Sequence, residues 1–449
     1  VSAVSNGKDR GIATAGGLTL LSENETPANG MVAYVTSDYN TGWMNGDIKL
    51  ATLSDTDAED AVGTELVTNG TFASDTGWTK GTGWTISGGG AVASSVVSGV
   101  KITSTAFTVT AGYYTMALDI STSASTYFFG VQGATSEHTG VKSTQGTVSI
   151  TRYLNAGSHT AFIGAWSSGL SGTFDNFSIR KAERDHSAEV QGLQVFGTVT
   201  KTAVATGADL MAYSGFSDST NYLFQPYNSD LDFGTGDFSV MLWFNTPDKS
   251  ATGTLLHRGS NDIDDTSWAT NAVTQIEFNT SNLYALVGTN NFGTNSGPNV
   301  PLTSISNNTW HHYVMVRRSG RIYAYLDGNY IDDVDNILTN TNSTGKVYIG
   351  ERPYASRVFN GSLALYRISA TAPSAEQIAK MYNDEKYLFQ ENAKATLYGT
   401  SDAVTALAYD DATELLHVGT SAGRSVFQGL RRVDNTTDAV GAAISASNG

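Results

Sequence analysis

Three carboxylate side chains lie close together in the polar stretch Gly259-Ser-Asn-Asp-Ile-Asp-Asp-Thr-Ser-Trp268. Asp262, Asp264 and Asp265 supply three hard oxygen ligands of the kind that Ca²⁺ prefers. The stretch therefore predicts a calcium site. The alternative is a solvated acidic loop in an acidic chain.

Sugar binding takes an exposed aromatic ring that stacks on a pyranose, with amide or charged groups for the hydroxyls. Trp268 and Phe292 lie in polar stretches, and Tyr354 lies beside Arg352, so we expect these side chains to share one rim. Trp166 lies between small and polar residues in Ala165-Trp-Ser-Ser-Gly169. These five residues are the predicted ligand contacts.

Hydrolytic chemistry lacks the groups it needs. Cleavage of a glycosidic bond takes two carboxylates at a set separation, and no convincing pair is present. The absence of cysteine excludes thiol nucleophiles and zinc–thiolate sites. His311 and His312 are adjacent and so point to opposite faces of a strand, where we expect structural roles. We therefore expect no enzymatic activity.

Composition indicates the elements that carry these side chains. Only 15% of the 449 residues are charged and 47 are glycine, which is typical of turn-rich β-structure in several domains. A net charge of −16 repels phosphate groups, so nucleic acid is not an expected partner. No run of ~18 apolar residues occurs, so we expect no membrane insertion.

The chain begins at Val1 and ends at Gly449 abruptly, which suggests a fragment of a longer protein. Residues 1–60 are expected to form a β-rich terminal segment. In it, Asn45-Gly46 predicts a hairpin between strands at residues 30–36 and 47–53.

Residues 61–184 contain short strands every ~8–12 residues, which is typical of a sandwich. The opening Asn69-Gly-Thr-Phe72, the following Gly77-Trp78 and the closing Phe174-Asp-Asn-Phe-Ser-Ile179 resemble galactose-binding-like jelly-roll modules of carbohydrate-binding proteins. The resemblance implies a structural Ca²⁺ held near Glu65 and Asp175. Ala73 stands where the family often has Glu, which departs from that site's pattern.

Residues 185–392 carry a second motif set. Phe238-Ser-Val-Met-Leu-Trp-Phe244, Trp310-His-His312, Tyr325-Leu-Asp-Gly328 and Phe359-Asn-Gly-Ser-Leu363 follow in an order that resembles concanavalin A-like, laminin-G-type domains. Glucanases of that family carry Glu-x-Asp-x-x-Glu, whereas the nearest run here, Glu183 to Glu189, is one residue too long. A helix is predicted near 374–389, with Ser374 as N-cap and Gln377 completing a capping box.

Residues 393–449 resemble one β-propeller blade, as residues 1–60 do more loosely. The expected fold class is thus all-β, with two sandwiches between β-rich terminal segments. This cysteine-free set resembles phage tail-fibre or bacterial surface proteins. The resemblance implies a non-enzymatic adhesin on a virion or bacterial cell surface. Its expected partners are a cell-surface glycan or polysaccharide, virion proteins and copies of itself, with a trimer by analogy.

Two alternatives come from other functional classes. The first is a structural filament or capsid-appendage subunit whose terminal strands pair between subunits. The second is a polysaccharide depolymerase with an unfamiliar carboxylate pair.

Overall fold

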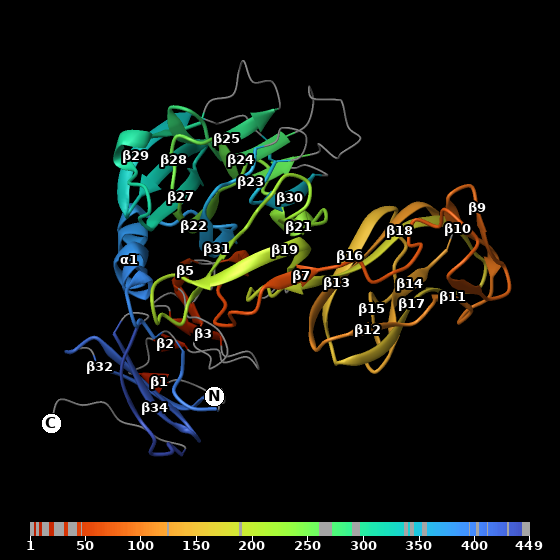
Figure 1. Cartoon of the computed structure of the whole chain (residues 1–449), viewed down its shortest axis with the longest axis horizontal. Helices are drawn as coiled ribbons and strands as arrows, with labels where there is room; N and C mark the ends of the chain where they lie inside the picture. Colours follow the sequence, from red (N-terminus) through yellow and green to blue (C-terminus); the bar gives the residue numbers. More distant parts are fainter. Residues whose placement is uncertain are drawn as a thin grey trace.

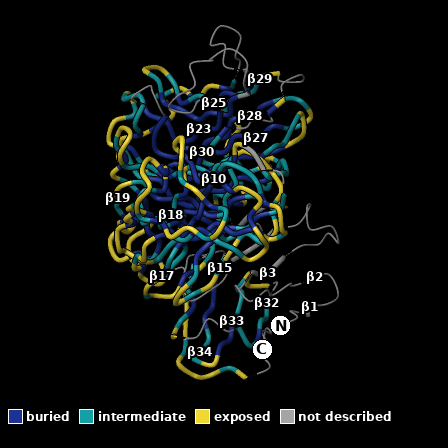
Figure 2. The backbone as a smooth tube through the Cα atoms, turned by 90° about the vertical axis from the view of Figure 1, so that its right-hand side faces the viewer, coloured by how far each residue is buried: buried dark blue, intermediate teal, exposed yellow. Residues whose placement is uncertain are grey.

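β-Strands account for most of the regular structure of the chain, which confirms the all-β prediction. The structure, a computed structural model, describes residues 4–5, 9–10, 18–21, 31–34, 43–45 and 47–441, apart from 124, 188–190, 260–271, 290–296, 336–339, 342–344, 353–356, 395, 401–403, 411 and 429–430. Two sandwiches lie side by side in Figure 1, and buried residues concentrate within them in Figure 2.

The jelly-roll module, residues 64–183, lies at the right of Figure 1. One sheet has the strand order β9 (Trp84–Ser87), β10 (Gly90–Val96), β18 (Leu170–Glu183), β13 (Gly112–Ser123), β16 (Gly146–Leu154). The other has the order β15 (Glu137–His138), β14 (Tyr127–Gly133), β17 (Gly157–Ala165), β11 (Lys101–Ser104), β8 (Trp78–Lys80), with β12 (Phe107–Val109) also pairing with β17. Trp78, Phe129 and Phe177 pack in the core between the sheets.

The second sandwich also consists of two antiparallel sheets. Sheet 1 contains β6 (Ile48–Thr52), β20 (Met211–Ser214), β31 (Ser362–Ser369), β22 (Phe238–Asn245), β27 (His311–Arg318), β28 (Arg321–Leu326) and β29 (Asn329–Asp335). Sheet 2 contains β19 (Leu193–Ala203), β21 (Tyr222–Gln225), β30 (Lys346–Ile349), β23 (Gly253–Gly259), β24 (Ala272–Phe278), β25 (Asn282–Thr289) and β26 (Asn299–Pro301). β19 joins the sheets, because it pairs with both β20 and β21.

The outward face of sheet 1 is covered by α1 (Ala375–Glu385), followed by the 3₁₀ turn η4 (Lys386–Phe389). Ser374 and Gln377 form the predicted capping box. Ile378 and Met381 pack on the outward side chains of β22, β27 and β28. Two further 3₁₀ turns are η2 (Ser229–Leu231) and η3 (Leu302–Ser304).

The adjacent histidines occupy opposite faces of β27, as predicted. His311 lies beside the core residue Phe244, and its Nδ1 is 2.7 Å from Asp327 Oδ2. His312 lies under α1 beside the rings of Trp243 and Tyr382. Burial keeps the pKa of His312 well below its ordinary value. His311 therefore holds a polar contact inside the sandwich, and His312 packs between sheet 1 and α1.

The jelly-roll module is an insertion within the second sandwich. β6 precedes the module in sequence but pairs with β31, and β7 (Ala61–Gly63) pairs with β19. At the module's other end, β18 continues into the second sandwich, where Ala182 and Glu183 pair with β19. The boundary expected at residue 60 is thus corrected, because residues 48–52 belong to sheet 1.

Small sheets form from both terminal segments. Near the N-terminus, β1 (Val4–Ser5) pairs with β2 (Asp9–Arg10), and β3 (Leu18–Leu21), β4 (Met31–Tyr34) and β5 (Trp43–Asn45) form a second sheet. Since β4 pairs with β5, the predicted hairpin of residues 30–36 with 47–53 is wrong. Near the C-terminus, β32 (Val404–Asp410), β33 (Leu415–Thr420), β34 (Gly423–Gln428) and β35 (Arg431–Thr436) form a meander. No helix in the described ranges is long and apolar enough to cross a bilayer.

Candidate functional site

The outward face of sheet 2 carries polar and aromatic side chains, in contrast to the helix-covered face of sheet 1. Strand alternation explains the arrangement on β24, because Ile276 and Phe278 pack in the core while Gln275 and Glu277 point the other way. On β25, Leu283 and Ala285 face the core. The intervening side chain of Tyr284 therefore reaches the same outward face as Glu277.

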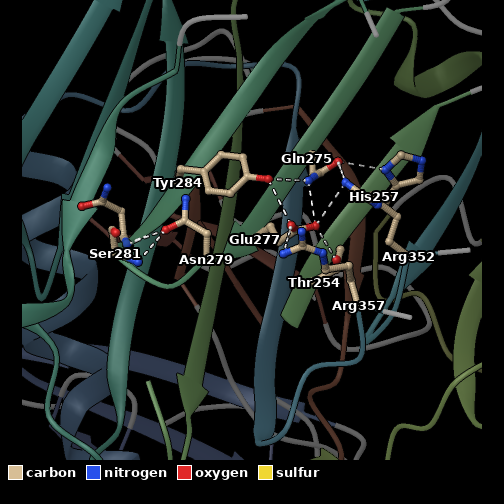
Figure 3. A network of polar contacts seen from close by, with 10 residues as sticks. Thr254, His257, Gln275, Glu277, Asn279, Ser281, Tyr284, Arg352 and Arg357 are labelled. Carbon is tan, nitrogen blue, oxygen red and sulfur yellow. Dashed lines mark hydrogen bonds and ion pairs between the residues drawn. The ribbon is translucent and has the colours of Figure 1, made fainter. Parts of the chain in front are cut away.

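Three neutral donors bind the buried carboxylate of Glu277 (Figure 3). Thr254 Oγ1 and Gln275 Nε2 each donate to Oε2 at 2.8 Å, and the Tyr284 hydroxyl donates to Oε1 at 3.1 Å. Burial and the negative charge of Glu277 raise the pKa of Tyr284, so this tyrosine keeps its proton. The carboxylate is therefore held in one position.

Two arginines from one segment complete the network. Arg352 Nη1 lies 3.5 Å from Glu277 Oε2, and Arg357 Nη1 lies 3.3 Å from Oε1. Glu277 and Arg352 are buried, whereas the Arg357 side chain is 34% exposed. Arg357 therefore presents a cation at the surface in a position fixed by Glu277.

A row of aromatic rings leads along the same face toward this network. Phe196 of β19 stacks on Tyr222 of β21 with ring centroids 4.6 Å apart. Tyr348 of β30 lies 5.1 Å from Phe224 and 6.4 Å from His257 of β23. We call Phe196, Tyr222, Phe224 and Tyr348 the aromatic row.

His257 joins the aromatic row to the network. Its Nδ1 lies 3.3 Å from Gln275 Oε1, and Arg352 Nη1 donates to the same oxygen at 3.4 Å. Burial, with the positive charge of Arg352, lowers the pKa of His257 to about 4. The ring is therefore neutral at physiological pH, and Arg352 and Arg357 supply the positive charges of the network.

Six predicted site residues lie outside the described residues: Trp268, Phe292, Tyr354, Asp262, Asp264 and Asp265. Their described neighbours in sequence still locate the two ends of sheet 2. Ala272 pairs with Thr289 at the end from which segments 260–271 and 290–296 depart. Arg357 O accepts from Thr254 N at the opposite end, roughly 20 Å away along the strands. The flanks of Trp268 and Phe292 thus share one end of the sheet, whereas those of Tyr354 lie at the other.

Trp166 lies on the jelly-roll module with 49% of its surface exposed. Its ring meets Phe128 edge-on at 5.6 Å, and Phe128 meets Phe162 in the same way at 5.2 Å. Lys101 Nζ lies 3.9 Å from the centroid of the Phe162 ring. Trp166 is thus the exposed end of an aromatic cluster on the outer face of β14, β17 and β11.

Protein donors occupy the carboxylate of Glu65. Its Oε1 accepts from the backbone N–H groups of Val67 at 3.0 Å and Ile179 at 2.9 Å. Its Oε2 accepts from Ser178 Oγ at 2.6 Å and lies 3.2 Å from Arg180 Nε. An arginine partner is unfavourable for a calcium ligand, because it supplies the positive charge that the ion would supply.

Asp175 lies on β18 opposite Asp119 of β13. Burial, with a smaller contribution from the charge of Asp119, raises its pKa. Within the described ranges, no group of three or more His, Asp or Glu side chains is arranged to hold a metal ion. The predicted calcium sites therefore remain predictions.

Two features of the structure are not predicted from the sequence. The polar positions of Thr274-Gln-Ile-Glu-Phe278 alternate with core positions, and this alternation was the available signal for the Glu277 network. Gly419-Thr-Ser-Ala-Gly423 has the Gly-x-Ser-x-Gly spacing of a nucleophile elbow. The structure places it in the hairpin between β33 and β34, whereas an elbow joins a strand to a helix.

Glu351, next to Arg352, gives a pH-dependent prediction. The side chain is buried and accepts from Ser219 N at 2.8 Å, and burial raises its pKa to about 7. Because the folded-state pKa lies above the ordinary value of 4.5, its stability contribution is complete below pH 4.5 and is lost as pH rises through 7. We expect Glu351→Gln to be more stable than the parent at pH 8 by about 2 kcal/mol, with little difference at pH 4.5. Thermal unfolding of both proteins at the two pH values measures this, and equal shifts at both would contradict it.

No curated protein sequence matches the chain. Among solved structures, the binding domain of Paraclostridial Mosquitocidal Protein 1 is similar at 16% identity and a TM-score of 0.38, covering 54% of this chain and 61% of that one. The receptor binding domain of botulinum neurotoxin C/D mosaic serotype is similar at 12% identity and a TM-score of 0.37, covering 55% and 59%.

The match to a protein family is confined to the second sandwich. It begins shortly after β20 and ends within α1, so it includes β22, β27, β28 and β31, whose residues carry the motifs quoted above. It also includes all the residues of the Glu277 network. Residues 217–379 match the model of the concanavalin A-like lectin/glucanases superfamily, which confirms the resemblance for this part of the chain.

Proposed function

We propose that the protein is a non-enzymatic glycan-binding protein, an adhesin or appendage component of a virion or bacterial cell surface. The binding site is the outward face of sheet 2. The observation that carries this proposal is the continuity of the aromatic row with the Glu277 network. A sugar ring stacks on aromatic faces, and Arg357 offers fixed donors to its hydroxyl or carboxylate groups.

The absence of catalysis is part of the proposal. The contacts described for Glu277 are to hydroxyl, amide and guanidinium groups. A glycosidase needs a second carboxylate across the bond from the first. Residues 217–379 match a superfamily named for both lectins and glucanases, so this match is compatible with a binding role as well as with a catalytic one. A reducing-end release assay on any polysaccharide that binds distinguishes the two.

The first test is a glycan array probed with the intact chain in calcium and again with a chelator. We expect binding to a specific polysaccharide. Arg357→Ala and Tyr222→Ala should each reduce it at least tenfold. Tyr330→Ala is the matched control, because Tyr330 is 53% exposed on β29 of the other sheet.

Trp268→Ala and the chelator test the two remaining parts of the prediction. Loss of binding in Trp268→Ala would add residues 260–271 to the site, and loss with the chelator would establish calcium as a cofactor. A blank array under both conditions would overturn the proposal.

A structural role for the terminal sheets is the second candidate. β32 and β35 are the outer strands of the C-terminal meander, and β3 and β5 are those of an N-terminal sheet. Outer strands with free backbone groups can pair with strands of other subunits. If this is the function, removal of residues 400–449 will convert an oligomer to a monomer in light scattering, whereas an unchanged mass would contradict it.

A further inference from the structure

A cleft between the two sandwiches is independent of the Glu277 network. Its volume is about 530 Å³, which lies in the range of small-molecule sites. The jelly-roll wall comes from residues 65–71 and from β13, β16 and β18, and most of the opposite wall comes from β19, β21 and β30. Asp119, Thr147 and Asn176 line the first wall, and Phe196, Phe224 and Lys346 line the second.

The walls of this cleft are fixed relative to each other. β18 passes from the jelly-roll module into sheet 2, where Ala182 pairs with Gln194. Arg180 spans the junction, because its Nη1 donates to Gly63 O at 2.7 Å and its guanidinium lies 4.2 Å from the centroid of the Phe196 ring. The cleft is therefore preformed, which lowers the entropy cost of binding.

Polar groups on the jelly-roll wall are positioned for hydroxyl recognition. Asp119 Oδ1 accepts from Thr147 Oγ1 at 2.6 Å, and Oδ2 accepts from Asn176 Nδ2 at 2.9 Å. Each carboxylate oxygen has a second lone pair, so it can accept from a ligand hydroxyl as well. The exposed Asn176 side chain holds one of these oxygens in place.

The opposite wall offers apolar ring surface. Phe196 and Phe224 line the cleft with ring centroids 5.5 Å apart. Tyr222 stacks on the Phe196 ring and the Arg180 guanidinium lies over it, so the partly exposed Phe224 ring supplies the surface for stacking. Lys346 Nζ lies 5.8 Å from the Phe224 centroid. Ring surface facing a fixed carboxylate suits a ligand with one apolar face and several hydroxyls, which is the character of a pyranose.

The charges select an uncharged sugar over an anion. Arg180 is paired with Glu65 at 3.2 Å, which cancels its charge. Asp119 and Lys346 balance across the cleft, so the lining has no net positive charge. A phosphate or sulfate would meet the Asp119 carboxylate, whereas a neutral hydroxyl donates to it.

We propose that this cleft is a second binding site, which takes one or two neutral sugar units at the junction of the modules. It shares with the proposed function the chemical class of the ligand and part of the aromatic row. Two rings of the aromatic row line it, so a long polysaccharide could occupy the cleft and the outward face of sheet 2 together.

The test uses the intact chain, with the methyl glycosides of glucose, galactose and mannose as probes. Saturation-transfer difference NMR measures their binding. We expect at least one glycoside to bind, and Asp119→Asn and Asn176→Ala each to weaken it about tenfold. Asp75→Asn is the matched control, because Asp75 is an exposed carboxylate elsewhere on the jelly-roll module. Unchanged melting temperatures show that the variants fold.

The outcomes separate this inference from the proposed function. Arg357→Ala should leave the Asp119-dependent part of glycoside binding intact, since Arg357 does not line the cleft. Weakening by Arg357→Ala but not by Asp119→Asn would overturn the inference and support the outward face. Absence of glycoside binding alongside a positive array would also overturn it. Competition by inorganic phosphate would overturn the assignment of a neutral sugar. Asp119-dependent glycoside binding, together with a glycan array that shows no binding, would support the inference and overturn the proposed function.

Discussion

Replacement of Arg367 by methionine is expected to destabilise the second sandwich by about 3–5 kcal/mol. Arg367 of β31 forms a bidentate ion pair with Glu385 of α1, and both side chains are at most 1% exposed. Trp243 Nε1 also donates to Glu385 Oε2 at 2.7 Å. Without the arginine, a carboxylate stays buried with the indole N–H as its remaining described donor. Urea unfolding, monitored by tryptophan fluorescence, measures the loss of stability.

Two control variants test this explanation. Arg367→Met combined with Glu385→Met removes both charges, so it should recover most of the lost stability. Lys380→Met removes the exposed partner of Asp384 on the same helix and should cost about 0.3–0.5 kcal/mol. If Arg367→Met were as mild as Lys380→Met, the buried pair would not hold α1 on sheet 1.

Replacement of Glu277 by leucine is expected to produce a loss of similar size, about 3–5 kcal/mol, together with loss of glycan binding. Arg352 would remain buried without its counter-charge, and the hydroxyl groups of Thr254 and Tyr284 would lose their acceptor. Arg357 would lose the carboxylate that fixes it at the surface. Urea unfolding and the glycan array are the two measurements.

Glu277→Gln separates the two effects of this substitution. The amide keeps the shape and one acceptor oxygen, so we expect a smaller stability loss of about 2 kcal/mol. Binding should still fall, because both arginines lose their ion pair. Glu277→Leu combined with Arg352→Leu should restore stability but leave binding absent. Normal binding in this double variant would show that the network serves the fold alone.

Much of the second sandwich could be predicted because its signals are local. Trp310-His-His312 and Tyr325-Leu-Asp-Gly328 lie on or between strands that pair with near neighbours in sequence. The capping box at Ser374 also depends on residues only three apart. Such contacts leave a pattern that a single sequence shows directly.

The insertion of the jelly-roll module could not be predicted in the same way. β6 is a five-residue strand, and it follows a plausible hairpin turn at Asn45-Gly46. Its actual partner, β31, lies more than 300 residues later, as the hydrogen bond from Ser369 Oγ to Asp47 O illustrates with a separation of 322. Local turn chemistry therefore favoured the wrong pairing.

In the candidate site, too, features that depend on local sequence are predictable and features that depend on distant strands are not. Exposure of Trp166 followed from its small polar neighbours, and the structure agrees. The sequence predicts Arg352 as a ligand contact, whereas its side chain is buried against Glu277 and Gln275, and Arg357 is the exposed partner of Glu277. Which of two nearby arginines points inward depends on contacts with β24, where Gln275 is 77 residues away from Arg352 in sequence, and no local pattern records such contacts.

The pairing of β6 with β31 also constrains the order of events during synthesis. β6 leaves the ribosome before its partner β31 does. β31 follows only after the whole jelly-roll module and most of the second sandwich have been synthesised. The jelly-roll strands lie within residues 78–183, so that module can fold early and bring β7 close to β19. The loop that β31 must close is then much shorter than the sequence separation suggests. A chain that stops before residue 362 would leave β6 without its partner in sheet 1, whatever the state of the inserted module.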